Sequence, residues 1–79
     1  MKISVGLYAI LQKYLPADNT GRRCDVEVED GATVGDLLQL LKVPVKLAAL
    51  RLVNGVQSKP DKRLSEGDKV SIFPQIAGG

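Results

Sequence analysis

Two glycines, Gly78 and Gly79, are the residues of this chain best suited to chemistry. A carboxylate on a terminal glycine has no side chain beside it, and two glycines fit a channel only as wide as a backbone. Once activated, for example as a mixed anhydride with AMP, such a carboxylate becomes an acyl donor. The alternative is an ordinary frayed end, because chain termini are commonly disordered and tolerant of change.

The residues before the two glycines form a thin tail. Proline has no backbone N–H to give to a sheet, so Pro74 ends the strand that precedes it. Extended chain covers about 3.3–3.6 Å per residue, so the residues after Pro74 reach about 16–18 Å from the body. We therefore predict a flexible tail over residues 75–79, which consists of Gln75, Ile76, Ala77, Gly78 and Gly79.

The rest of the sequence lacks the residue sets of a self-sufficient active site. The chain has no histidine and one cysteine, Cys24, which excludes an internal disulfide and any familiar zinc, iron–sulfur or Ser/His/Asp site. Cys24 alternates with Val26 and Val28 and is interpreted as a small buried hydrophobe. No glycine-rich run has the spacing of a phosphate-binding loop or a dinucleotide-binding motif. We therefore expect no cofactor, no metal, and a protein that is not an enzyme but a substrate or carrier.

Charge and hydropathy exclude further classes. The net charge is +2, the basic residues are spread along the chain, and the few aromatic residues offer no stacking platform, so we expect no nucleic-acid partner. Asp25, Glu27 and Glu29 fall on one face of a strand and could bind a cation or a basic partner, although a solvated face explains them better. The N-terminal apolar run is too short for a signal peptide, and no stretch is long enough to span a membrane. These features predict a cytoplasmic protein with no membrane partner.

The 79 residues, 44% apolar and 25% charged, allow one small domain over residues 1–79. Apolar alternation predicts strands, apolar residues at helical spacing predict helices, and Asn54-Gly55 predicts a hairpin. Thr33 is a good N-cap residue for the main helix, and Asp36, three residues later, places a carboxylate near the helix N-terminus. The expected elements are strands at 3–7 and 24–28, a short helix at 9–15, a main helix at 34–42, hairpin strands at 50–53 and 56–58, and a last strand at 69–73.

This order predicts an α+β fold in which one face of a sheet packs on the main helix. The first and last strands are the most strand-like, so we place them at the centre of the sheet. Tyr8 and Phe73 then lie on the face opposite the helix, and Val53 could join them. An exposed apolar patch often marks a protein interface, so we predict that Tyr8, Val53, Phe73 and Pro74 bind a partner. The alternative is a strand register shifted by one residue, which would put the aromatic rings in the core.

Five short stretches, taken in order, match a known family. They are Val5–Ala9, Gly31–Leu38, Val53–Gly55, Leu64–Val70 and Phe73–Gly79. Together they span nearly the whole chain, which resembles the small sulfur-carrier proteins of the MoaD/ThiS type. This group includes the small subunit of molybdopterin synthase and the thiamine-pathway sulfur carrier. The resemblance implies a ubiquitin-like β-grasp fold, with a mixed sheet packed on one main helix and an extended C-terminal Gly-Gly tail.

The resemblance also implies a reaction. A ubiquitin-activating-type adenylating enzyme (similar to MoeB or ThiF) would use ATP to adenylate the Gly79 carboxylate, and sulfur from a persulfide donor would displace AMP to leave a thiocarboxylate. In molybdopterin synthase such a tail inserts into the large subunit, which holds the pyranopterin substrate. Gly78 and Gly79 match the tail motif, and Tyr8 and Phe73 match apolar positions of the partner-binding face.

Two departures from the family pattern concern the pathway. The tail has Phe-Pro-Gln where the molybdopterin branch usually has Phe-Pro-Pro, and residues 42–50 are short for that branch, whereas the thiamine branch usually lacks the Phe-Pro element. The tail and first strand favour a carrier for molybdopterin, in a molybdenum or tungsten cofactor. The alternatives are a thiamine-type carrier, a ubiquitin-like modifier joined to lysines through Gly79, or an interaction module with an inert tail. The loop at 16–23, with Arg22 and Arg23, receives no role.

Overall fold

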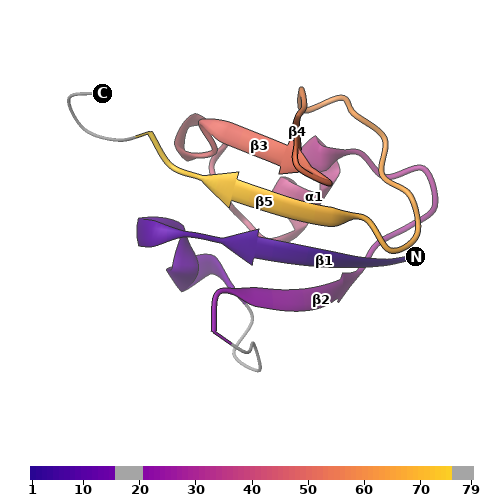
Figure 1. Ribbon diagram of the computed structural model, residues 1–79, viewed down its shortest axis with the longest axis horizontal. Coiled ribbons are helices and arrows are strands. Elements are labelled where there is room, and N and C mark those ends of the chain that lie inside the picture. Colours follow the sequence, from indigo (N-terminus) through magenta and orange to yellow (C-terminus); the bar gives the residue numbers. More distant parts are fainter. Residues whose placement is uncertain (16–20, 76–79) are drawn as a thin grey trace.

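The computed structural model describes residues 1–15 and 21–75, and its elements follow the predicted order (Figure 1). In these ranges the strands are β1 (Lys2–Leu7), β2 (Arg23–Glu27), β3 (Leu50–Val53), β4 (Val56–Gln57) and β5 (Lys69–Phe73), the α-helix is α1 (Val34–Leu40), and the 3₁₀ helices are η1 (Ala9–Tyr14) and η2 (Val45–Leu47). None of these helices, within the described ranges, is long and apolar enough to cross a membrane. A mixed sheet with a helix on one face confirms the predicted α+β class.

β5 lies at the centre of the sheet, whose strand order is β2-β1-β5-β3-β4. It pairs in parallel with β1, with Val5 opposite Val70, and antiparallel with β3, with Leu50 opposite Phe73. The first and last strands are thus neighbours in the middle of the sheet, as predicted. Because the two strands are parallel, the C-terminal ends of β1 and β5 lie next to each other at one end of the sheet (Figure 1).

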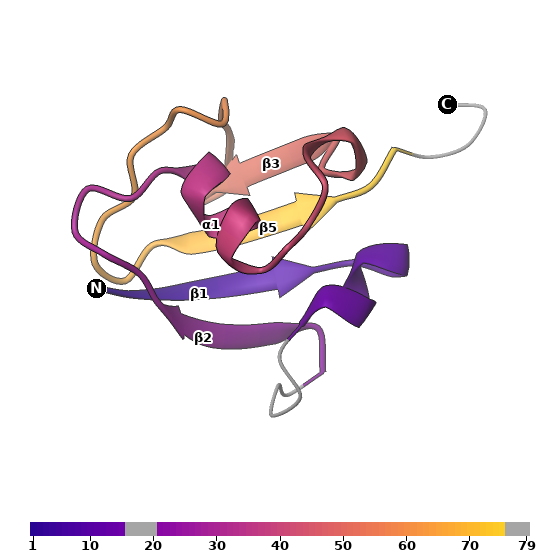
Figure 2. The ribbon, with the colours of Figure 1, turned by 180° about the vertical axis from the view of Figure 1, so that it is seen from behind.

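The inner face of the sheet is the one that α1 covers (Figure 2). Alternate residues of β1 and β5 point to this face because side chains alternate along a strand. α1 adds residues three or four apart, the spacing that keeps an apolar stripe on one side of a helix. The largest fully buried side chains are Ile3, Val5, Leu7, Leu11, Val34, Leu37, Leu38, Val70 and Ile72.

Val53 also belongs to this core, so its predicted place on the outer, partner-binding face is wrong. It pairs with Val70 in the sheet and is 4% exposed. Paired residues share a face of the sheet, and Val70 points toward α1. The neighbouring Leu52, which pairs with Ser71, is the β3 residue that points outward. Because β3 has apolar residues on both faces, alternation alone does not show which of them faces the helix.

α1 begins where the sequence predicts and ends earlier. Thr33 Oγ1 accepts a hydrogen bond from Asp36 N–H at 3.1 Å, and the Asp36 carboxylate accepts one from Thr33 N–H at 3.0 Å. This is a capping box with Asp in place of Glu. At the other end, Lys42 adopts a left-handed backbone with a φ of 62°. That turn closes the helix, so α1 ends at Leu40 rather than at the predicted Lys42.

The predicted short helix and hairpin are both present. The segment after β1 forms the 3₁₀ helix η1, which buries Leu11 and leaves Ile10 62% exposed. The turn between β3 and β4 has positive φ at Asn54 (53°) and Gly55 (84°), as an Asn-Gly hairpin requires.

Candidate functional site

β5 carries the chain to the predicted tail. The strand ends at Phe73, Pro74 is half-buried and Gln75 is exposed. Pro74 has no N–H for a further sheet bond, so pairing stops where the sequence predicts. The remaining tail residues, Ile76, Ala77, Gly78 and Gly79, lie outside the described residues. The site that the structure describes is the tail root, which is the outer face of the sheet around Tyr8, Phe73 and Pro74.

Two aromatic rings stack at the tail root. The ring centroids of Tyr8 and Phe73 are 4.5 Å apart and the ring planes differ by 9°. Tyr8 N–H also donates to the Ile72 carbonyl at 3.2 Å, which ties the end of β1 to β5. Both side chains are half-buried on the outer face, as predicted. Leu50, opposite Phe73, and Leu52 extend this apolar surface, although the sequence analysis did not select them.

Arg23 lies across the outer face beside the stacked rings. Its Nη1 donates to Tyr8 Oη at 2.9 Å and to Ser71 Oγ at 3.1 Å. Its Nη2 donates to the carbonyls of Val70 at 2.9 Å and Ser4 at 3.3 Å, and its Nε donates to Ser4 Oγ at 3.3 Å. All five N–H groups of the guanidinium thus bond to neutral oxygens. One side chain from β2 therefore ties together β1, β5 and the Tyr8 hydroxyl.

Gly6 leaves the space that Arg23 fills. It pairs with Arg23 in the sheet and is buried even though it is on the outer face. A Cβ at Gly6 would overlap Arg23 Nη1 and would lie 2.9 Å from Tyr8 Oη. The sequence analysis missed this arrangement, although a glycine inside a strand is a known sign of a close approach.

Arg22, the neighbour of Arg23, differs from it in every contact. Its side chain is exposed, and within the described ranges it makes no hydrogen bond or ion pair. Its backbone carbonyl accepts from Leu7 N–H at 3.0 Å. Of the two arginines that the sequence analysis left without a role, only Arg23 is part of the tail root.

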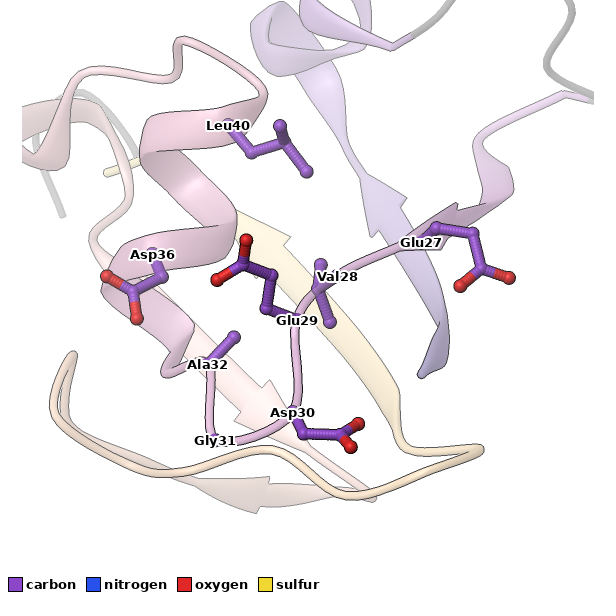
Figure 3. Close-up of a pocket in the computed structure, with 8 residues that line it drawn as sticks. All are labelled: Glu27, Val28, Glu29, Asp30, Gly31, Ala32, Asp36 and Leu40. Carbon is purple, nitrogen blue, oxygen red and sulfur yellow. The ribbon is translucent and has the colours of Figure 1, made fainter.

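A surface pocket of about 470 Å³ lies at the opposite end of the sheet, where β2 ends and α1 begins. It is lined by Glu27, Val28, Glu29, Asp30, Gly31, Ala32, Asp36 and Leu40 (Figure 3). The carboxylates do not converge, because Glu27 and Asp36 point away from each other and Asp36 caps α1 (Figure 3). The N-terminal ammonium lies 3.7 Å from both Glu27 and Asp30. Among residues 1–15 and 21–75, no group of acidic or cysteine side chains could hold a metal ion.

Comparison with known proteins identifies relatives by sequence. Residues 1–78 match the sequence model of the Mut7-C ubiquitin family. A curated relative, small archaeal modifier protein 3 of Haloferax volcanii, is 35% identical, and the alignment covers 66% of this chain and 75% of the relative.

Two solved structures extend the similarity to the fold. The crystal structure of SAMP1 from Haloferax volcanii has a TM-score of 0.72 and 26% identity, with 100% of both chains covered. A putative molybdopterin converting factor, subunit 1, from Pyrococcus furiosus has a TM-score of 0.70 and 25% identity over 95% of this chain and 98% of that chain. The mixed sheet with its helix is therefore the ubiquitin-like β-grasp fold that the family resemblance implies. The chain belongs to the Mut7-C ubiquitin family and is a ubiquitin-like protein of the MoaD/ThiS type.

Proposed function

We propose that this protein is a sulfur carrier and that the carboxylate of Gly79 is the group that is activated and receives the sulfur. The observation that carries the proposal is the Gly78-Gly79 motif, which follows the central strand β5 after a short tail in a ubiquitin-like chain. The domain at 1–73 then serves to present the tail. The proposal applies to the chain with Gly79 as its last residue. We place the loading of Gly79 with sulfur in the cytoplasm.

The proposed loading takes three steps. An oxygen of the Gly79 carboxylate attacks the α-phosphorus of ATP, pyrophosphate leaves, and an acyl adenylate forms. The terminal sulfur of a protein persulfide attacks the acyl carbon, and AMP leaves with the bonding electron pair. A thiol then cleaves the S–S bond, which leaves a thiocarboxylate on Gly79 and a disulfide on the donor. Because the sequence has no histidine and no phosphate-binding glycine loop, we assign the ATP chemistry to a separate ubiquitin-activating-type enzyme.

The tail root is the proposed surface for the partners. Tyr8, Phe73 and Pro74 are half-buried, and Leu50 and Leu52 continue the same outer face. A partner that covers this surface would meet the tail where it begins. The tail could then reach about 16–18 Å into a narrow site of that partner. Similarity to a putative molybdopterin converting factor subunit favours the large subunit of molybdopterin synthase as the sulfur acceptor.

Intact-mass spectrometry tests the loading step. We expect incubation with ATP, a sulfide source and the activating enzyme of the same organism to add about 16 Da, the exchange of one oxygen for one sulfur. A chain that ends at Ala77 is the matched control, because it keeps the domain and the tail root and lacks only the two glycines. An unchanged mass for the full chain with an active enzyme would reject the proposal.

A ubiquitin-like modifier is the second candidate, and a specific observation favours it. The curated relative at 35% identity is named a small archaeal modifier protein. The amine of a lysine on another protein would then attack the acyl carbon of the same adenylate, so that an isopeptide bond forms and AMP leaves. Gly-Gly remnants of this chain on lysines in digests of host proteins would support this role. A loaded chain that transfers sulfur to a pyranopterin precursor with the large subunit, and leaves no such remnants, would favour the carrier alone.

A further inference from the structure

We propose that Arg23 is a positioning residue that fixes the tail root and thereby the direction in which the chain leaves β5. Its guanidinium holds the outer face of the sheet together beside the last residues of that strand. The effect on sulfur loading rests on the proposed function, whereas the effect on the stacked rings does not.

The guanidinium is held from several directions. Each of its N–H groups has an acceptor, at distances from 2.9 to 3.3 Å. Hydrogen bonds from a cation are roughly twice as strong as those between neutral groups. The acceptors are hydroxyl and carbonyl oxygens of Ser4, Tyr8, Val70 and Ser71, so the position does not depend on an ion pair. A planar fork with five donors can join these acceptors, whereas the single ammonium of a lysine cannot.

A short series of contacts leads from Arg23 to the tail. Arg23 holds the Tyr8 hydroxyl, the Tyr8 ring stacks on Phe73, and Phe73 directly precedes Pro74. Two further acceptors on β5 fix the strand just before the stack. Because a proline restricts the residue before it and has a fixed φ itself, a Phe73 held in place fixes how the chain enters Pro74, where the tail begins. A tail with a fixed start loses less conformational freedom when it enters a partner.

Direct recognition of a partner's carboxylate is the other role that a surface arginine commonly has. The contacts of Arg23 do not favour it, because its five N–H groups are already bonded within the chain. Arg22 is the better placed of the two for that purpose, since its side chain is exposed. The two adjacent arginines therefore provide a matched pair for experiment.

The first test compares Arg23→Met with Arg22→Met. Methionine keeps an unbranched side chain and removes every N–H donor. NMR ring-current shifts of the Tyr8 and Phe73 ring protons report on the stack. We expect these shifts to move toward free amino-acid values in Arg23→Met and to stay unchanged in Arg22→Met. Unchanged ring shifts in a folded Arg23→Met protein would overturn the proposal.

Sulfur loading provides a second readout that a loss of stability alone would not produce. With the activating enzyme, ATP and sulfide, we expect the KM for Arg23→Met to rise about tenfold while kcat changes less than about twofold. The reason is that a misdirected tail docks less often, whereas the chemistry at Gly79 is unaltered. Equal kinetics for Arg23→Met and Arg22→Met would contradict the proposal. If the wild-type chain is not loaded at all, the proposed function fails, and the ring shifts still decide the role of Arg23.

Gly6→Ala tests the same arrangement without changing Arg23. The added methyl group would take the place of Nη1, so we expect it to disturb the ring shifts as Arg23→Met does. In the double variant, the second change should add little, because both act on one set of contacts. If the effects of Gly6→Ala and Arg23→Met on the ring shifts add fully in the double variant, the two positions are not coupled. If Arg23→Met does not fold, Arg23→Lys takes its place, because lysine keeps the positive charge but lacks the five-donor fork. We expect the ring shifts of Arg23→Lys to differ from those of the wild-type chain.

Discussion

The inner face of the sheet meets α1 through apolar side chains, whereas the outer face is held by one guanidinium and a pair of stacked rings. Among the described residues, the core contains no buried polar side chain. Apolar burial is non-directional, so it can stabilise a fold without fixing any particular atom. Hydrogen bonds have narrow geometry, and the five that Arg23 donates hold Ser4, Tyr8, Val70 and Ser71 in fixed positions beside the tail root. The inner face thus provides the stability of the domain, and the outer face sets the position at which the tail begins.

The largest effect should come from a charge on the inner face. Val53→Asp would bury a carboxylate with no partner, at a cost of about 4 kcal/mol or more. That is close to the whole stability expected of so small a domain, roughly 5 kcal/mol, so we expect circular dichroism to show an unfolded chain.

Leu52→Asp is the matched control for Val53→Asp. It puts the same charge one residue away, on the outer face, and should remain folded. If Leu52→Asp unfolds and Val53→Asp does not, the faces of β3 are assigned the wrong way round.

A charge in the stacked pair should have an intermediate effect on stability and a large one on function. Phe73→Asp loses the ring contact, so we expect a loss of about 1 kcal/mol in the free energy of unfolding. A domain of this size then melts about 4–8 °C lower, which differential scanning calorimetry can measure. Binding to the proposed large subunit should weaken at least about tenfold, since a central aromatic contact is lost. An unfolded Phe73→Asp chain would show that the ring contributes to the core.

The smallest effect should come from a single acceptor on the outer face. Ser71→Ala removes one of the bonds to Nη1 and leaves the other four. We expect the free energy of unfolding to fall by about 0.5–1 kcal/mol, with a measurable change in the Tyr8 and Phe73 ring shifts.

Ser58→Ala is the control for Ser71→Ala. The Ser58 hydroxyl donates to the carbonyl of Val56 in the edge strand β4, and Ser58 is not among the acceptors of Arg23. It should leave the ring shifts as they are. If both serine variants change the ring shifts equally, the stacking of Tyr8 on Phe73 does not depend on the hydrogen bonds of Arg23.

Local chemistry made most of the fold predictable from the sequence. β5 occupies the predicted residues 69–73 because Val70 and Ile72 alternate with polar neighbours and Pro74 ends the pairing. The start of α1 and the Asn54-Gly55 turn follow from side chains that act on the backbone within three residues. Each of these signals is complete within a few positions of the chain, so no knowledge of the tertiary structure is needed.

The parts that the sequence did not reveal depend on contacts between distant strands. Alternation shows that Arg23 and Gly6 each lie on one face, but not that the two are paired across the sheet. Nor does it choose between Leu52 and Val53, since both are apolar and the choice depends on the pairing of β3 with β5. The predicted tail chemistry stays a prediction, because residues 76–79 lie outside the described residues.

Synthesis of the chain runs from β1 to β5, so the two strands paired at the centre of the sheet are made first and last. Contacts between segments so far apart in sequence cannot form early, and they also slow folding. Until β5 is available, the apolar faces of β1 and α1 lack their central neighbour. A growing or prematurely terminated chain therefore remains open to chaperones and proteases. Only a chain that has been translated through β5, up to the start of the tail, can complete the sheet. Folding therefore distinguishes such chains from shorter products.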